Sequence, residues 1–336
     1  MTLRIGINGF GRIGRNIVRA GWNRDGVSFV HINDLTSVDM LAYLLAHDSV
    51  HRPWSVPVGH EGSNLVIDGR VVSTSAERDP AKIAWSDVGV DLVLECTGLF
   101  TSRDKAAVHL AGGAKKVIVS APATGADATL VYGVNHHDYD AASHHVVSNA
   151  SCTTNCLAPV AMVLHDTVGI EHGLMTTVHS YTMDQNLLDA PHRGGDFRRS
   201  RAAAVNMVPS STGAAKAIGL VLPALQGKLD GMAVRVPTPN GSLIDLTIRT
   251  TRETTAAEVL AALRAAAEGP LRGVLQFSTD ELVSSDIVGN PHSSILDSTL
   301  TQVRDGRMVK VFSWYDNEWG FSNRMVDLAL HVGGSL

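Results

Sequence analysis

The chain has 336 residues, of which 44% are hydrophobic, and it carries a formal net charge of −5. A chain of this length exceeds what one hydrophobic core usually organises, so two domains are expected. The charge gives no basic face for nucleic acid, and no apolar run approaches the roughly 20 residues of a membrane span. We therefore expect a protein that binds neither nucleic acid nor membrane.

Cysteine and histidine usage suggests the compartment and the absence of a metal site. The three cysteines, Cys96, Cys152 and Cys156, are odd in number and lack disulfide-framework spacing, which fits a reducing cytoplasm. The first residues enter a strand pattern at once, so no signal peptide is expected. The pairs His136-His137 and His144-His145 lack cysteine or carboxylate partners at ligand spacing, so we expect no metal site.

The first 150 residues alternate strand and helix patterns, which predicts a doubly wound, Rossmann-type parallel sheet in an α/β domain. The expected helices are Ile13–Ala20, Val38–Leu45 and Arg103–Ala111. The expected strands are Leu3–Asn8, Val27–Asn33, a looser stretch at Ser63–Ser73, Val90–Cys96, Lys116–Ser120, Thr129–Val134 and His145–Asn149.

Beyond Cys152 one helix is followed by strands without regular crossover helices, which predicts an α+β domain with a mainly antiparallel sheet. In Leu243–Arg249, apolar and polar residues alternate, as expected for a strand in a sheet with one buried and one solvent-exposed face. The expected strands are Met175–Tyr181, Gly231–Val236, Leu243–Thr250, Val274–Ser278, Ser294–Thr301 and Met308–Tyr315. Helices are expected at Thr255–Glu268, which Gly269-Pro270 ends, and at Phe321–Val332.

A glycine motif at the first strand–helix turn indicates dinucleotide binding. In Gly9-Phe-Gly-Arg-Ile-Gly14, the glycines permit a tight turn, a close backbone approach to a pyrophosphate and close helix packing. Asp34 ends the second strand, where a carboxylate can bind ribose hydroxyls and repel a 2′-phosphate. This combination favours NAD over NADP, the alternative being a merely structural glycine turn.

A cysteine at the start of a helix is the best candidate nucleophile. Cys152 lies between hydroxyl-bearing residues and directly precedes the apolar pattern Leu157, Val160, Ala161, Leu164. Unpaired N–H groups at a helix start favour the thiolate, so we expect a lowered Cys152 pKa. Cys156, one turn deeper, suits a buried thiol.

A base and an anion site can be proposed from the second domain. His179, at the end of a strand, could take a proton beside Cys152, although a histidine satisfied within the sheet is the alternative. The hydroxyl- and glycine-containing run Ser210–Lys216 precedes a helix and could hold a phosphate. Arg199 and Arg235 have side chains suited to forked phosphate contacts, although each alone could be a surface charge.

These residues resemble phosphorylating glyceraldehyde-3-phosphate dehydrogenases from Ile5 to His331. The resemblance rests on Ile7–Gly14, Ser148–Leu157, His179, Ser211–Lys216, Gly231–Thr238 and Ser313–Gly320. It implies NAD-dependent oxidative phosphorylation of D-glyceraldehyde 3-phosphate to 1,3-bisphosphoglycerate in glycolysis and gluconeogenesis. It also implies a homotetramer.

The resemblance assigns a role to each matching position. Cys152 would form the hemithioacetal and thioester, with His179 as base. Substrate and phosphate would be held by Ser151, Thr153, Thr182, Asp184, Arg199, Thr212, Gly213 and Arg235. NAD would be held by Asn8, Gly9, Phe10, Gly11, Arg12, Ile13, Asp34, Arg78, Thr97, Ser120 and Asn317. The expected domains are 1–151 for NAD, with a C-terminal helix 318–336 packing back on it, and 152–317 for catalysis.

Several positions depart from the family pattern and leave alternatives open. They are Phe321, Met183, Gly241, Arg52-Pro53 and Ala190-Pro191. The departures are compatible with a secondary or inhibitor-resistant copy of the enzyme, and Ala190 weakens the NAD assignment. Rival interpretations are an erythrose-4-phosphate dehydrogenase, an aspartate-semialdehyde type of dehydrogenase and a non-catalytic NAD-binding redox sensor.

Overall fold

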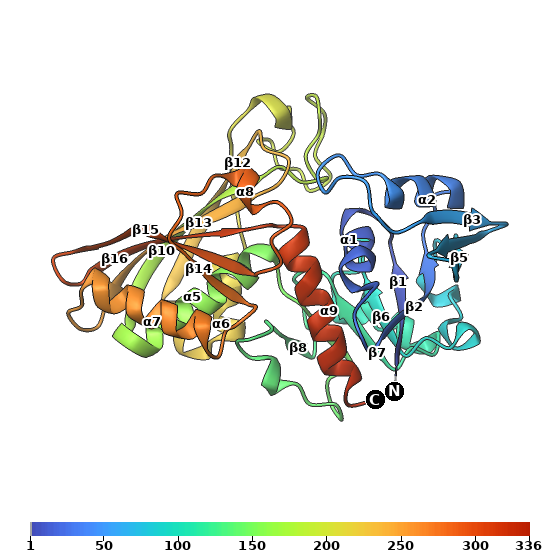
Figure 1. Cartoon of the computed structure of the whole chain (residues 1–336), viewed down its shortest axis with the longest axis horizontal. Coiled ribbons are helices and arrows are strands. Elements are labelled where there is room, and N and C mark those ends of the chain that lie inside the picture. The colour runs from blue at the N-terminus through green and yellow to red at the C-terminus, as the bar shows by residue number, and fades with distance from the viewer. Residues whose placement is uncertain (1) are drawn as a thin grey trace. The chain divides into compact units, whose positions relative to one another are not determined.

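The computed structural model describes residues 2–336, which cluster into two units (Figure 1). One unit comprises the chain up to Ser151 together with Ser322–Leu336, and the other comprises Cys152–Phe321. Within the described residues, no helix is long and apolar enough to cross a membrane.

The first unit is built on a nine-stranded sheet with the order β3-β4-β5-β2-β1-β6-β7-β9-β8. β1 lies between β2 and β6 and is parallel to both, so the chain winds outward from it in two directions. The carboxyl ends of strands at such a reversal point form the usual ligand crevice of this architecture. The strands are β1 (Leu3–Asn8), β2 (Val27–Asn33), β3 (Val58–Glu61), β4 (Asn64–Ile67), β5 (Arg70–Ser75), β6 (Leu92–Glu95), β7 (Lys116–Val119), β8 (Ala128–Thr129) and β9 (Val146–Ser148).

The helices of this unit include the C-terminal one. A side chain at Gly21 would press against Val326, and Arg24 forms a 2.7 Å ion pair with Asp327, so α9 packs against the end of α1. The helices are α1 (Arg12–Gly21), α2 (Val38–Ala46), α3 (Arg103–Ala106), α4 (Val108–Ala111) and α9 (Trp319–Gly333). Single 3-10 turns occupy Pro80–Lys82, Trp85–Val88 and His136–Asp138.

The strand character expected at Ser63–Ser73 is confirmed, as part of an antiparallel β3-β4-β5 meander. Two other element predictions for this unit need correction. The helix expected at Arg103–Ala111 is broken at Ala107. The strand expected at Thr129–Val134 ends at Thr129. The Asn135 side chain accepts the Val131 N–H (2.8 Å), and Gly133 takes φ +87°, so the apolar run folds into a turn.

The second unit is built on a seven-stranded sheet with the order β11-β12-β10-β13-β16-β15-β14. The β10–β12 and β14–β15 pairs are parallel and the other four are antiparallel, so the mainly antiparallel expectation is confirmed. Ile244, Leu246 and Ile248 are buried, as the period-two pattern predicts. The strands are β10 (Ile170–Ser180), β11 (Val208–Ser211), β12 (Leu229–Val236), β13 (Ser242–Thr250), β14 (Leu275–Ser278), β15 (Ser294–Arg304) and β16 (Met308–Tyr315).

Three helices pack together against one face of this sheet (Figure 1). They are α5 (Cys152–Val168), α6 (Ala214–Val221) and α7 (Ala256–Glu268), and a short α8 (Ser284–Ile287) adjoins β16. Further 3-10 turns lie at Ala203–Val205 and Pro223–Leu225. The apolar residues predicted to face the core from α5, such as Leu157 and Val160, are fully buried.

Candidate active site and cofactor cleft

The nucleophile candidate lies at the first residue of α5, as the sequence predicts. Its sulfur is 3.5 Å from Nε2 of His179, which is 3% exposed near the end of β10. Helix α5 and strand β10 are consecutive elements of one unit, so the chain returns to bring the imidazole against the helix start. The structure thereby pairs two residues that are 27 positions apart.

The other nitrogen of His179 determines which tautomer faces the sulfur. Nδ1 is 2.6 Å from the carbonyl oxygen of Ser180, and a carbonyl can only accept. We therefore assign the proton to Nδ1 and a free lone pair to Nε2, toward Cys152. Arg235 Nη1 lies 3.0 Å from the same nitrogen, and its N–H groups are directed to the Ser180 carbonyl and the Thr182 hydroxyl.

Burial disfavours the charged form of both residues. Burial lowers the pKa of His179 to about 3, and the charge of Arg235 adds to the shift. Burial also raises the pKa of Cys152, although Arg235 and the start of α5 act in the opposite direction. The expected lowered thiol pKa is therefore wrong for this state, because loss of water outweighs the helix-start field.

An arginine cluster adjoins His179. Arg235, on β12, pairs in register with His179. Its guanidinium contacts Thr182 at 3.1 Å, and the Thr182 hydroxyl donates to Asp184. Arg199 forms a 2.6 Å ion pair with Asp184. Burial alone would raise the pKa of Asp184, but the Thr182 hydroxyl and the two arginines outweigh it and lower that pKa.

The hydroxyl run after β11 begins a helix, as expected. Gly213 is the N-cap of α6, and the Thr212 hydroxyl accepts the Ala214 N–H at 3.2 Å. Arg199 Nη2 donates to the Ser211 carbonyl at 3.3 Å, which joins this turn to the arginine cluster. The structure thus brings Thr182, Asp184, Arg199, Arg235 and the turn at 211–213 into one polar region.

Tyr315 is a site residue that reasoning from the sequence did not identify. It lies at the end of β16, 1% exposed, with its ring edge-on to His179 at 5.9 Å. Its hydroxyl is 2.9 Å from the Thr153 hydroxyl and 2.8 Å from that of Thr177. Burial raises its pKa well above the ordinary value, so the phenol stays protonated. The only sequence signal was a polar-tipped aromatic residue at the end of a strand.

The dinucleotide candidates line a cleft of about 300 Å³ in the first unit. Gly9 takes φ +92°, and a Cβ there would lie 2.7 Å from the Thr97 nitrogen, so only glycine fits between the two turns. A Cβ at Gly14 would lie 2.4 Å from the Gly9 carbonyl, which bears out its predicted close-packing role. The predicted residues in the lining are Asn8, Gly9, Gly11, Asp34, Arg78 and Thr97.

The remaining dinucleotide candidates lie outside that lining. Phe10 is buried, and its N–H donates to Asp34 at 2.7 Å. The Arg12 guanidinium pairs with Asp48 at 2.6 Å, and Ser120 follows β7. Asn317 belongs to the second unit, where its side chain accepts from the Ser242 hydroxyl at 2.8 Å.

Two departures from the family pattern have local explanations. Gly241 takes φ +89°, and a Cβ there would lie 2.5 Å from the Ser284 carbonyl, so this backbone requires glycine. Arg52 also has a positive φ, and its carbonyl accepts from Arg19 at 2.9 Å. Met183 is 81% exposed and Phe321 is 5% exposed.

Comparison with known protein families covers both units. Residues 3–103 match the family described as glyceraldehyde 3-phosphate dehydrogenase, NAD binding domain. Residues 151–317 match the family described as glyceraldehyde 3-phosphate dehydrogenase, C-terminal domain.

Three relatives that align over almost the whole chain bear the same family name. The chain is 59% identical over 332 residues to glyceraldehyde-3-phosphate dehydrogenase 1 of Bacillus subtilis (strain 168), covering 99% of this chain and 98% of the relative. It is 61% identical over 325 residues to glyceraldehyde-3-phosphate dehydrogenase of Kitasatospora aureofaciens, covering 96% and 97%. It is 56% identical over 337 residues to glyceraldehyde-3-phosphate dehydrogenase 2 of Streptomyces arenae, covering both chains completely.

Proposed function

Because the chain belongs to the glyceraldehyde-3-phosphate dehydrogenase family, we propose that it oxidises and phosphorylates D-glyceraldehyde 3-phosphate to 1,3-bisphosphoglycerate. It is an NAD-dependent phosphorylating aldehyde dehydrogenase of glycolysis. The observation that best supports this chemistry is the 3.5 Å contact between the Cys152 sulfur and an unprotonated His179 nitrogen.

The first step is attack by sulfur on the aldehyde carbon. As the C–S bond forms, the Cys152 thiol proton passes to Nε2 of His179. The imidazolium then donates that proton to the former aldehyde oxygen, which gives a neutral hemithioacetal and leaves His179 free to act again as base. The Ser180 carbonyl holds Nδ1–H throughout and stabilises the imidazolium. We assign to the backbone N–H groups at the start of α5 the stabilisation of the oxygen that becomes charged.

Oxidation leaves a thioester on Cys152. When bound, NAD supplies the acceptor for the hydride that leaves the hemithioacetal carbon. His179 removes the proton of the hemithioacetal hydroxyl, so the carbonyl re-forms as the hydride departs. Inorganic phosphate then attacks the thioester carbon, and the Cys152 sulfur leaves and is reprotonated.

Two phosphate groups need cationic partners in this reaction. We assign this role to Arg199 and Arg235, assisted by Thr182 and Asp184, because these side chains form one hydrogen-bonded group beside His179. A phosphate at Arg235 would offset the charge that lowers the His179 pKa. Anion binding therefore makes His179 a stronger base. The further phosphate ligands that we propose are Ser151, Thr153, Thr212 and Gly213.

NAD binding is assigned to the cleft at the carboxyl ends of β1, β2 and β6. Asp34 would accept hydrogen bonds from the adenosine ribose, and the Gly9–Gly11 turn would approach the pyrophosphate. The other residues of the proposed set are Asn8, Phe10, Arg12, Ile13, Arg78, Thr97, Ser120 and Asn317. We propose residues 1–151 with helix 318–336 as the NAD-binding domain and 152–317 as the catalytic domain.

We propose a cytoplasmic homotetramer. Leu174 on β10, Met232 on β12 and Met308 on β16 are large, exposed apolar side chains of the second sheet, in which β12 adjoins β10 and only β13 separates β10 from β16. Such a surface is suited to contact with another copy of the chain. The three free cysteines fit a reducing compartment.

Steady-state NADH formation tests the function. We expect activity with D-glyceraldehyde 3-phosphate and NAD that depends on inorganic phosphate, and no acyl transfer by Cys152→Ser. Retention of phosphate-dependent NADH formation by Cys152→Ser would overturn the mechanism. Erythrose 4-phosphate is the comparison substrate, and a higher kcat/KM for it would reverse the substrate assignment.

A further inference from the structure

A buried carboxylate lies beneath the cofactor cleft at the last residue of β6. Glu95 is 1% exposed and accepts four hydrogen bonds. Oε1 accepts from the Thr97 N–H (2.8 Å) and hydroxyl (2.5 Å), and Oε2 accepts from Asn8 Nδ2 (2.6 Å) and His109 Nε2 (3.0 Å). These four donors fill the acceptor positions of an ionised carboxylate.

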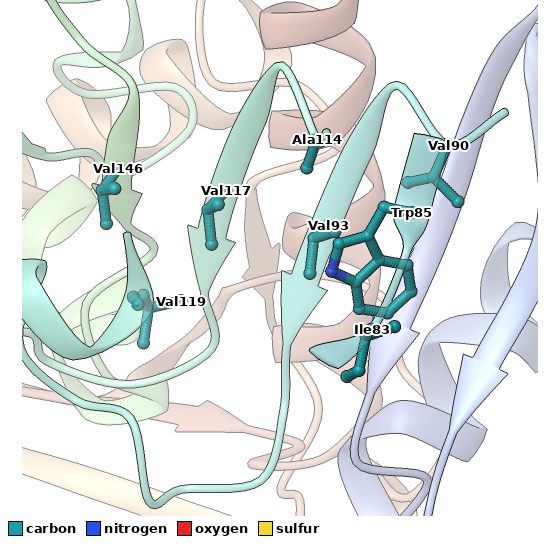
Figure 2. Close-up of a cluster of buried hydrophobic side chains, with 9 residues drawn as sticks. Ile83, Trp85, Val90, Val93, Ala114, Val117, Val119 and Val146 are labelled. Carbon is teal, nitrogen blue, oxygen red and sulfur yellow. The ribbon is translucent and has the colours of Figure 1, made fainter. Parts of the chain in front are cut away.

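On the side of the hydrophobic core, Trp85 determines which nitrogen of His109 carries the proton that Glu95 accepts. The Trp85 indole can only donate, and it donates to His109 Nδ1 at 3.1 Å. His109 is therefore neutral, carries its proton on Nε2 and donates it to Glu95. Figure 2 shows Trp85 packed among the fully or largely buried side chains Ile83, Val90 and Val93, which hold the indole in place.

On its other side, Glu95 accepts hydrogen bonds from residues that line the cleft. Asn8 and Thr97 both line that cleft. Asn8 is the last residue of β1, and Thr97 lies two residues beyond the end of the neighbouring parallel strand β6. Asn8 Oδ1 accepts from Asn33 Nδ2 at 2.8 Å, and Asn33 Oδ1 accepts from the Ser75 hydroxyl at 2.8 Å. The hydrogen-bonded group thus crosses the carboxyl ends of β5, β2, β1 and β6, which are adjacent in the sheet.

We propose that Glu95 is a positioning residue for the dinucleotide, held by His109 and Trp85. Its carboxylate fixes the side chain of Asn8 and the backbone of Thr97 in one geometry before NAD arrives. Binding then avoids the cost of ordering those groups. This inference rests on the NAD-dependent function proposed above and adds Glu95, His109 and Trp85 to it.

The substitution Glu95→Gln tests the carboxylate at nearly constant volume. The amide replaces one acceptor oxygen with an NH₂ group, which then faces donors from either Thr97 or the Asn8–His109 side. Isothermal titration of the full-length variant with NAD should give a dissociation constant about tenfold higher than that of the native protein. In assays, KM for NAD should rise while KM for the aldehyde changes less than twofold.

Two further variants keep the test decisive. Asp127→Asn is the matched control, because Asp127 is a largely buried carboxylate of the same unit that accepts from His145, Val146 and Arg103 away from the cleft lining. Its affinity for NAD should stay within twofold of native. Trp85→Phe removes the indole N–H donor and also shortens a fully buried ring, and it should weaken NAD binding about two- to threefold.

The outcomes separate this inference from the function itself. If native protein fails to bind NAD, the proposed function fails. If native protein binds but Glu95→Gln binds within twofold of it, or loses no more affinity than Asp127→Asn, the positioning role is refuted. Should Glu95→Gln not fold, unchanged NAD affinity in Trp85→Phe would refute it.

Discussion

Removal of the Tyr315 hydroxyl is the perturbation whose effect the structure determines most closely. Tyr315→Phe keeps the ring, which is 1% exposed, and deletes the oxygen that joins the hydroxyls of Thr153 and Thr177. One threonine comes from the first turn of α5 and the other from β10, so the substitution disconnects the nucleophile helix from the strand that carries the base.

The expected magnitude follows from two hydrogen bonds and their surroundings. Each buried hydrogen bond contributes roughly 1 kcal/mol net to the free energy of unfolding. Threonine hydroxyls that are left buried without a hydrogen-bond partner lower that free energy further. Thr177 is fully buried and Thr153 is 4% exposed, so little water can replace the phenol. We expect the free energy of unfolding to fall by about 2–3 kcal/mol.

Urea unfolding of the cofactor-free protein, at one fixed protomer concentration, measures this change. Tyr139→Phe is the matched control, since the Tyr139 hydroxyl is buried and has no hydrogen-bond partner among the described residues. It should be neutral or slightly stabilising. The reasoning is refuted if Tyr315→Phe costs less than about 0.5 kcal/mol, or no more than Tyr139→Phe.

Three further predictions concern the base, the cofactor and one backbone position. Native apoprotein should lose stability as pH falls from 6.5 toward 3, by up to about 1.4 kcal/mol per unit, because His179 takes a proton far more readily when unfolded. His179→Asn should flatten that pH dependence in urea unfolding and slow single-turnover hydride transfer by about 10²- to 10⁴-fold; an unaltered profile would exclude His179 as its source. Asp34→Ala should lower the NAD-to-NADP ratio of kcat/KM, and an unchanged ratio would remove Asp34 from cofactor selection. Gly241→Val should destabilise by roughly 2 kcal/mol because of its positive φ and the Ser284 carbonyl; a stability equal to native would contradict this.

Local patterns predicted most strands and helices. They also indicated the glycine turn, Asp34, Cys152, His179 and an anion site with Arg199 and Arg235, whereas the other site residues were implied by the family resemblance. The bounds of the expected strands Leu3–Asn8 and Val27–Asn33 agree with the structure to the residue. Short apolar runs bounded by turn residues are typical of strands. The strand expected at Thr129–Val134 is wrong beyond Thr129, because a hydrogen bond from the Val131 N–H to the Asn135 side chain closes a turn that hydrophobicity alone does not reveal. Strand β11 was missed because its residues were assigned to a phosphate loop.

By itself the sequence determined the two-domain α/β and α+β organisation, the glycine turn that requires Gly9, and Cys152 at a helix start. These features depend on residues close together in the chain. Only the tertiary structure decided the 3.5 Å approach of Cys152 to His179, the linking of Thr153 and Thr177 through Tyr315, and the burial of Glu95 beneath the cleft. It also determined the burial that raises the pKa of Cys152 and lowers that of His179. The physical reason is that a pKa and a hydrogen-bond geometry depend on which distant segments exclude water from a group, and chain position does not record that.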